Sequence, residues 1–180
     1  MSKNKLNVGI ILGSTRNGRT SPAVGEWVKS LADKREVATF EIVDIKEYHL
    51  PFLGESDDMT QVINWNNKLN ELDAFIFVVA EYNHSITGAL KNALDSARDA
   101  WNNKSAGIVS YGSAGGARAA EHLRGILGEL QVADVRTHTL LSLFHDFKDG
   151  EFKPQAIHQA NINDMLDQLI TWGNALKSTR

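Results

Sequence analysis

The segment Gly13–Pro22 combines the residue types that bind phosphate and directly follows the apolar run Val8–Leu12. Its glycines let backbone N–H groups approach an anion, its hydroxyls donate hydrogen bonds, and the start of the following helix favours negative charge. Arginine adds a planar fork of donors that matches phosphate oxygens. The segment therefore predicts a phosphate-binding loop, and an exposed, solubilising turn is the alternative. The donor side chains are Ser14, Thr15, Arg16, Arg19, Thr20 and Ser21.

Two further loops with unusual residues follow apolar strands. The segment Glu81–Gly88 places an aromatic ring, an amide and several free backbone groups immediately after a buried strand. Such a set can recognise a flat heterocycle by stacking and by hydrogen bonds to its edge. The alternative is a polar connection that caps the next helix. The segment Gly112–Gly116 consists of small residues, which let the backbone pack closely against a ligand.

Several familiar enzyme motifs do not fit these loops. The first loop nearly matches the G-x-x-x-x-G-K-[ST] motif of nucleotide triphosphatases, but Arg19 stands in place of the lysine. The dinucleotide fingerprint G-x-G-x-x-G is absent from the first turn. Ser113 lies outside any G-x-S-x-G elbow, and the six histidines show no metal-binding spacing. The sequence therefore predicts no metal site and no nucleophilic triad.

Strands and helices alternate along the whole chain, as their apolar periodicity indicates. The first, third and fourth strands are continuous apolar runs, which is typical of strands covered on both faces. The second and fifth strands alternate, as edge strands do. Strands are predicted at Val8–Leu12, Glu36–Val43, Asp73–Ala80, Ala106–Ser110 and Asp134–Leu140, and helices at Pro22–Asp33, Met59–Glu71, Gly88–Trp101, around Leu123–Leu130 and at Gln155–Leu176.

This pattern predicts a flavodoxin-like, doubly wound α/β fold: a five-stranded parallel sheet in the order 2-1-3-4-5 with helices on both faces. Residues 1–180 are expected to form a single domain. Because the carboxyl ends of parallel strands lie at one edge of the sheet, the three loops are expected to meet in one crevice there.

Composition limits the classes of partner. The chain has 180 residues, 42% of them hydrophobic, and a net charge of -3, which favours neither nucleic acid nor a membrane surface. The absence of cysteine excludes disulfides and thiol chemistry and fits the cytoplasm. The first five residues show no secretion signal, and no apolar run approaches the ~20 residues that a membrane helix needs.

The three loops resemble motifs of the NAD(P)H-dependent FMN reductase family, which includes azo, quinone and chromate reductases. The resemblance covers nearly the whole chain. The loops are similar to G-S-x-R-x-G-R-x-S, P-E-Y-N-x-S-x-P-G-x-L-K-N-A-x-D and G-S-x-G-G-A-R, respectively. Ala80 and Thr87 replace two prolines of the second motif and so remove two backbone constraints. The matching residues are Gly13, Ser14, Arg16, Gly18, Arg19 and Ser21; Glu81, Tyr82, Asn83, Ser85, Gly88, Leu90, Lys91, Asn92, Ala93 and Asp95; and Gly112, Ser113, Gly115, Gly116, Ala117 and Arg118.

This resemblance implies noncovalently bound FMN as cofactor, with NADPH or NADH as the electron donor. The first loop would hold the FMN phosphate, the second would line the isoalloxazine, and the third would approach the pyrimidine side of the ring. Family members usually form dimers or tetramers, so a homodimer or homotetramer is expected. The implied FMN-binding residues are Ser14, Arg16, Arg19, Thr20, Ser21, Glu81, Tyr82, Asn83, Gly112, Ser113 and Gly115.

The predicted function is an oxidoreductase that passes hydride from NAD(P)H to bound FMN and then reduces a small-molecule acceptor such as a flavin, quinone or azo compound. The cofactor performs this chemistry, so no side chain is assigned a catalytic role. A flavodoxin-type electron carrier and a non-catalytic binding module are the alternatives. The two arginines and the small net charge disfavour the carrier, whose phosphate loop typically lacks arginine and whose surface is strongly acidic.

Overall fold

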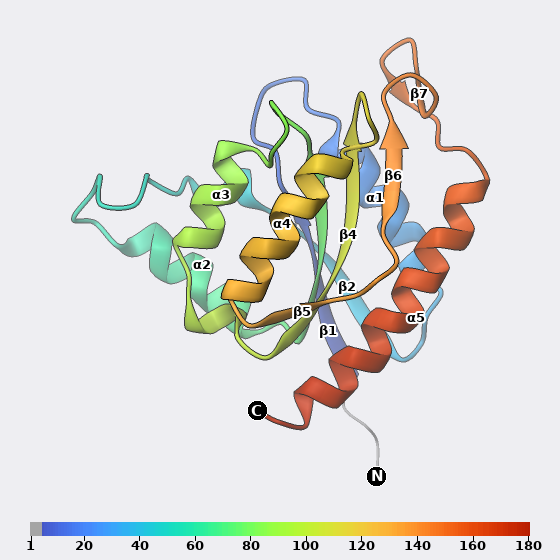
Figure 1. Ribbon diagram of the computed structural model, residues 1–180. Coiled ribbons are helices and arrows are strands. Elements are labelled where there is room, and N and C mark those ends of the chain that lie inside the picture. The colour runs from blue at the N-terminus through green and yellow to red at the C-terminus, as the bar shows by residue number, and fades with distance from the viewer. Residues whose placement is uncertain (1–4) are drawn as a thin grey trace.

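The computed structural model describes residues 5–180 and is built around a parallel sheet (Figure 1). Its strands are β1 Leu6–Leu12, β2 Ala38–Asp44, β3 Ala74–Ala80, β4 Lys104–Gly112, β5 Val132–Asp134 and β6 Thr139–Ser142. The order β2-β1-β3-β4-β5, with β6 also beside β4, confirms the predicted flavodoxin-like topology. A separate hairpin consists of β7 Phe147–Lys148 and β8 Glu151–Phe152. Residues 1–4, part of the segment predicted to lack a secretion signal, lie outside the described residues.

Helices cover both faces of the sheet, as the sequence predicts (Figure 1). They are α1 Ser21–Ala32, α2 Thr60–Asn70, α3 Gly88–Asp95, α4 Ala117–Glu129 and α5 Ile157–Lys177, with the short helices η1 Ile45–Tyr48 and η2 Asp99–Trp101. α1 and α5 pack on one face, and α2, α3 and α4 pack on the other. β3 and β4 are buried at every position, which explains their apolar runs. No helix within residues 5–180 has the length and apolar character needed to span a membrane.

The predicted fifth strand is two short strands, β5 and β6, with residues 135–138 between them outside the sheet. Side chains replace the missing ladder bonds there. Thr137 exchanges hydrogen bonds with the Gln168 side chain, at 3.0 Å from its N–H and 2.7 Å to its hydroxyl. Arg124 donates to the carbonyls of Val135 (3.1 Å) and Arg136 (3.2 Å). The strand can therefore break without leaving these backbone groups unpaired.

The helix predicted over Gly88–Trp101 ends at Asp95, and its C-terminal part is the separate turn η2. The Ser96 hydroxyl donates back to the carbonyl of Asn92 (2.7 Å), a local bond that competes with helix continuation. The buried indole N–H of Trp101 donates to the carbonyl of Leu94 (3.1 Å), so a side chain satisfies one of the last carbonyls of the helix.

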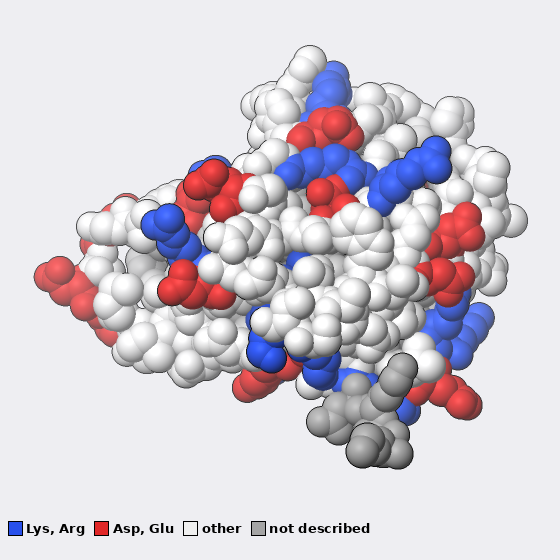
Figure 2. Space-filling model, turned by 60° about the horizontal axis from the view of Figure 1, so that its bottom comes forward, with Lys and Arg blue, Asp and Glu red and all other residues white. Residues whose placement is uncertain are grey.

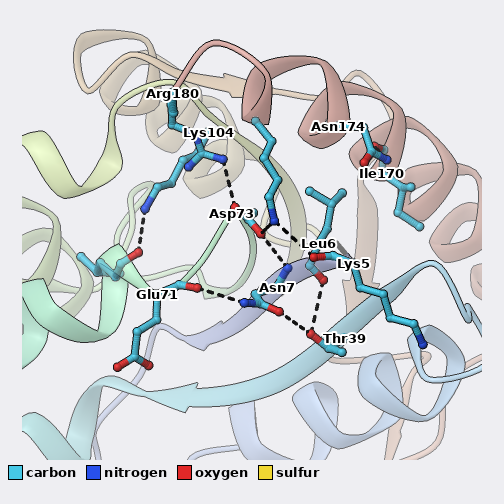
Figure 3. A network of polar contacts seen from close by, with 12 residues as sticks. Lys5, Leu6, Asn7, Thr39, Glu71, Asp73, Lys104, Ile170, Asn174 and Arg180 are labelled. Carbon is cyan, nitrogen blue, oxygen red and sulfur yellow. Dashed lines mark hydrogen bonds and ion pairs between the residues drawn. The ribbon is translucent and has the colours of Figure 1, made fainter. Parts of the chain in front are cut away.

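A polar network closes the edge of the sheet opposite to the three loops (Figure 3). Asp73, directly before β3, accepts bonds from the N–H of Asn7 (2.9 Å) and from Lys177 in the last turn of α5 (2.6 Å). Lys104 is only 4% exposed, and its Nζ donates to the carbonyl of Leu69 (2.7 Å). Burial lowers the pKa of Lys104 to about 8, and the nearby Arg180 acts in the same direction.

Charged side chains are mixed on the molecular face drawn in Figure 2, where lysines and arginines lie next to aspartates and glutamates. The ion pairs Lys68–Glu71 and Lys91–Asp95 likewise join side chains of opposite charge. The drawn face therefore lacks the extended basic surface that a nucleic-acid site requires.

Candidate functional site

The loops after β1, β3 and β4 lie together at the carboxyl edge of the sheet (Figure 1). The N–H of Gly13 donates to the carbonyl of Val78 (2.9 Å), which ties the first loop to β3. The N–H of Glu81 donates to the carbonyl of Tyr111 (3.0 Å), which ties the second loop to β4. The structure thus brings the three loops to one edge, as the predicted strand order requires.

Thr87 joins the second loop to the first. Its buried hydroxyl donates to the carbonyl of Gly13 (2.5 Å) and accepts the N–H of Leu90 (3.0 Å), so it also caps α3. Its φ of -66° is the value that proline imposes. Threonine therefore keeps the backbone angle of the family's proline and adds a bond between two loops. The sequence analysis gave helix capping as an alternative role of this loop, and Thr87 provides that cap. It did not predict the bond from Thr87 to Gly13.

The two arginines of the first loop have different surroundings. Arg19 forms a two-pronged ion pair with Asp44 at the end of β2, with Nη1–Oδ1 at 2.6 Å. The same Nη1 donates to the carbonyl of Ser14 (2.6 Å). Both side chains of the pair are mostly buried, and the hydrogen bond to Asp44 raises the pKa of Arg19. Arg19 therefore fixes the shape of the loop, and its charge is balanced within the chain.

Arg16, by contrast, is exposed, and its side chain forms no hydrogen bond or ion pair with another residue of the described chain. Thr20 Oγ1 and Ser21 Oγ lie close to Arg16 in the sequence and are buried, with no hydrogen-bond partner among residues 5–180. Buried hydroxyls without partners are rare. They lie where α1 begins, and the first N–H groups of a helix also lack partners within it. One free guanidinium and several unsatisfied donors fit a phosphate group.

The phenol of Tyr111 faces the same hydroxyls. Burial raises the pKa of Tyr111, while Thr20, Ser21 and Ser14 act against that rise. The phenol nevertheless leaves Thr20 Oγ1 and Ser21 Oγ without a properly oriented hydrogen bond. The hydroxyls of Thr20 and Ser21 therefore receive no hydrogen bond from the described chain and are available to a ligand.

The second loop is a tight turn. Tyr82 and Ser85 exchange backbone hydrogen bonds of 2.9 and 3.0 Å, and Asn83 and His84 between them have φ of 46° and 68°. Two left-handed central residues define a type I′ geometry, which asparagine tolerates well and which strains most other side chains. The turn leaves Tyr82 41% exposed at the crevice.

The Glu81 carboxylate is used inside the protein. It is 4% exposed and accepts the N–H of Arg118 (3.0 Å), the N–H of Ala119 (3.3 Å) and Nε of Arg118 (2.6 Å). Burial alone would raise the pKa of Glu81, but the bonds from Arg118 and from the start of α4 outweigh it and lower the pKa. Glu81 therefore links β3 to α4, and its backbone rather than its carboxylate is left to face a ligand.

The third loop has glycine where no side chain fits. A Cβ at Gly112 would lie 3.0 Å from the Glu81 Cβ and 3.1 Å from the Gly116 nitrogen. Gly115 has a φ of 68°, and its carbonyl accepts the Ser110 hydroxyl (2.9 Å). Ser113 is exposed at the tip. The loop therefore presents backbone and one hydroxyl to the crevice.

A cavity of about 150 Å³ opens between the first two loops, lined by Ser14, Thr15, Arg16, Tyr82, Thr87, Gly88 and Ala89. It brings together Ser14, Arg16 and Tyr82 of the predicted FMN-binding residues. Arg19 and Glu81 turn away from it toward their ion-pair partners. Sequence reasoning missed Asp44, although a parallel pairing of the first two strands places the end of β2 beside the end of β1.

A parallel flavodoxin-like sheet with unsatisfied anion donors at its carboxyl edge is typical of flavin-binding proteins. The sequence model of the "NADPH-dependent FMN reductase" family matches residues 6–146. The chain belongs to this family, and the predicted recognition is confirmed. The family reduces FMN with NADPH, so its members use flavin and a pyridine nucleotide.

One curated relative supports this assignment, and a second relative and a solved structure are also similar to the chain. The chain is 30% identical to an NAD(P)H-dependent FMN reductase of Saccharomyces cerevisiae, over 71% of this chain and 76% of the relative. It is 28% identical to a quinone reductase of Escherichia coli, over 98% of both chains. The solved structure of FerB, a flavoenzyme NAD(P)H:(acceptor) oxidoreductase from Paracoccus denitrificans, superposes with a TM-score of 0.76 at 20% identity, covering 94% and 98% of the two chains.

Proposed function

We propose that this protein binds FMN in the crevice and uses it to oxidise NAD(P)H and reduce a small-molecule acceptor such as a quinone, a free flavin or an azo compound. The observation that carries the proposal is the pair of buried hydroxyls of Thr20 and Ser21 that have no partner in the described chain, in the same loop as the unpaired Arg16. A phosphate group would satisfy all three at the start of α1. Membership of the reductase family supports the same conclusion.

The chain's own residues would hold the cofactor in two parts. Arg16, Thr20 and Ser21 would bind the phosphate, with Ser14 below them and Arg19 keeping the loop in shape. Bound FMN would supply the acceptance of hydride and its delivery to the acceptor. The described crevice offers binding and orientation, and we assign no side chain to a proton transfer. The residues proposed for the ring are Tyr82, Asn83, Gly112, Ser113 and Gly115, with the backbone of Glu81.

Titration of the flavin-free protein with FMN, followed by flavin fluorescence, tests this proposal. Riboflavin is the matched probe, because it has the same ring system and lacks the phosphate. We expect the protein to bind FMN much more tightly than riboflavin. Arg16→Ala should remove much of that difference, whereas Arg98→Ala, at an exposed arginine after α3, is the control that leaves it unchanged. Equal affinities for FMN and riboflavin would contradict the phosphate site.

Steady-state oxidation of NADPH separates the reductase from the other two candidates. The reductase should turn over with FMN bound and a quinone as acceptor. A protein that binds FMN without oxidising NADPH would be an electron carrier, and one that takes up no FMN would be a binding module.

We also propose a homodimer or homotetramer located in the cytoplasm. A groove between α3 and α4 exposes part of Ile126 and Leu130, which a second copy could cover. Light scattering of the purified protein tests the assembly, and a monomeric mass at micromolar concentration would contradict it.

A further inference from the structure

A second, larger cavity of about 520 Å³ adjoins the predicted phosphate site. It shares Thr15, Gly88 and Ala89 with the smaller cavity, so the two spaces lie on either side of the same residues. Its volume falls within the range of small-molecule sites. None of the FMN contacts proposed above uses its remaining wall, which consists of Ile45, Lys46, His49, Leu50, Phe52 and Asn92.

This wall is held from both ends. At one end the Asp44 carboxylate, already paired with Arg19, accepts the N–H of Lys46 (3.0 Å). At the other end the Asn92 amide of α3 donates to the carbonyl of Pro51 (2.9 Å). Figure 1 shows this chain segment, between β2 and α2, passing beside α3. The cavity is therefore formed by the chain before any ligand arrives.

The chemistry of the wall suits a flat ring that carries a negative charge. Phe52 is 63% exposed at the rim, and Ile45 and Leu50 add apolar surface behind it. In the part of the chain that the structure describes, no carboxylate lies within ion-pair distance of the Lys46 ammonium. An uncovered aromatic face stacks on planar rings, and an unpaired ammonium attracts phosphate.

We propose that this cavity binds the adenosine part of NADPH, with adenine against Phe52 and the 2′-phosphate at Lys46. The inference rests on the proposed function, because a pyridine nucleotide that reaches a flavin in the crevice needs an adjoining surface for its other half. The cavity supplies that surface next to the phosphate loop. Lys46 would then favour NADPH over NADH, since the 2′-phosphate is the group that NADH lacks.

Calorimetric titration with 2′,5′-ADP, a probe that carries adenine and the 2′-phosphate but no nicotinamide, tests the inference on the flavin-free protein and again in the presence of excess FMN. We expect binding that Lys46→Gln weakens about tenfold or more, the loss typical of one charge-assisted contact. 5′-AMP lacks the 2′-phosphate and should bind equally to both proteins. Phe52→Ala should weaken both probes. Lys34→Gln, at an exposed lysine after α1, is the matched control.

FMN titration of the same variants separates the two proposals. Lys46→Gln and Phe52→Ala should keep the wild-type FMN affinity, because neither residue lines the smaller cavity. If FMN binds but 2′,5′-ADP does not, or if Lys46→Gln leaves 2′,5′-ADP affinity unchanged, the inference is wrong and the proposed function stands. If 2′,5′-ADP behaves as expected and FMN does not bind, the adenosine site stands and the proposed function fails.

Discussion

Arg19→Ala should lower the stability of the protein, whereas Arg16→Ala should lower its affinity for FMN, although both arginines belong to one loop. Arg19 is 12% exposed and Asp44 17% exposed, and removing one partner of such a pair leaves the other charge partly buried. A fully buried pair broken in this way costs about 3–5 kcal/mol, and residual solvent access reduces this to about 1–3 kcal/mol here. In a chain of this size each kcal/mol shifts Tm by about 2–4 °C.

Arg16→Ala should change stability little and weaken FMN binding. Its side chain makes no bond to the described chain, so its removal should change the free energy of unfolding by less than about 0.5 kcal/mol. If it binds the FMN phosphate, its loss removes a charge-assisted contact of about 1.5–3 kcal/mol, which is roughly a ten- to hundredfold loss of affinity.

Thermal unfolding of the flavin-free proteins and FMN titration measure the two effects separately. Asp44→Ala and the Arg19→Ala/Asp44→Ala double variant complete a cycle that isolates the energy of the pair. The reasoning is refuted if Arg19→Ala leaves Tm unchanged and weakens FMN as much as Arg16→Ala does. That result would place Arg19 on the phosphate rather than on Asp44.

Three further predictions concern stability. Glu81→Gln should destabilise the protein at neutral pH, and the difference should shrink as pH falls below about 4, because the lowered pKa of Glu81 means that its contribution is lost by protonation; urea unfolding at both pH values measures this. Thr87→Val should lower the free energy of unfolding by about 1–2 kcal/mol, because two hydrogen bonds are lost. Thr87→Pro should lose the same bonds while keeping φ. Similar urea midpoints for the two variants would confirm that the hydroxyl of Thr87 stabilises the fold, rather than its backbone angle. The folded pKa of Lys104, about 8, lies below its ordinary 10.5, so stability should rise with pH between these values. Lys104→Met should abolish that rise, and a persisting rise would contradict the assignment.

Periodicity and the right-handedness of parallel crossovers were together enough to predict the sheet order, because β3 and β4 are buried on both faces and β2 alternates. The interruption between β5 and β6 could not be predicted in this way. It depends on Gln168 in α5 and Arg124 in α4, which reach the free backbone groups from distant parts of the sequence.

The loops show the same division. Residue types predicted an anion site after β1, and the unsatisfied hydroxyls of Thr20 and Ser21 support it. The sequence does not distinguish Arg16 from Arg19, since their difference comes from Asp44, 25 residues beyond Arg19. Glu81 is a similar case, because its carboxylate is paired with Arg118 at the start of α4. Motifs predict which residues gather at an edge, and tertiary pairing decides which of them stay free for a ligand.

One carboxylate, that of Asp44, touches both the loop of the smaller cavity, through Arg19, and the wall of the larger one, through the Lys46 N–H. The walls of the two cavities are therefore both held in place by Asp44. Any adjustment of that support on filling one cavity changes the affinity of the other, and thermodynamic reciprocity makes the effect equal in both directions. The affinities of the two cavities could thus be coupled by a side chain that contacts neither occupant.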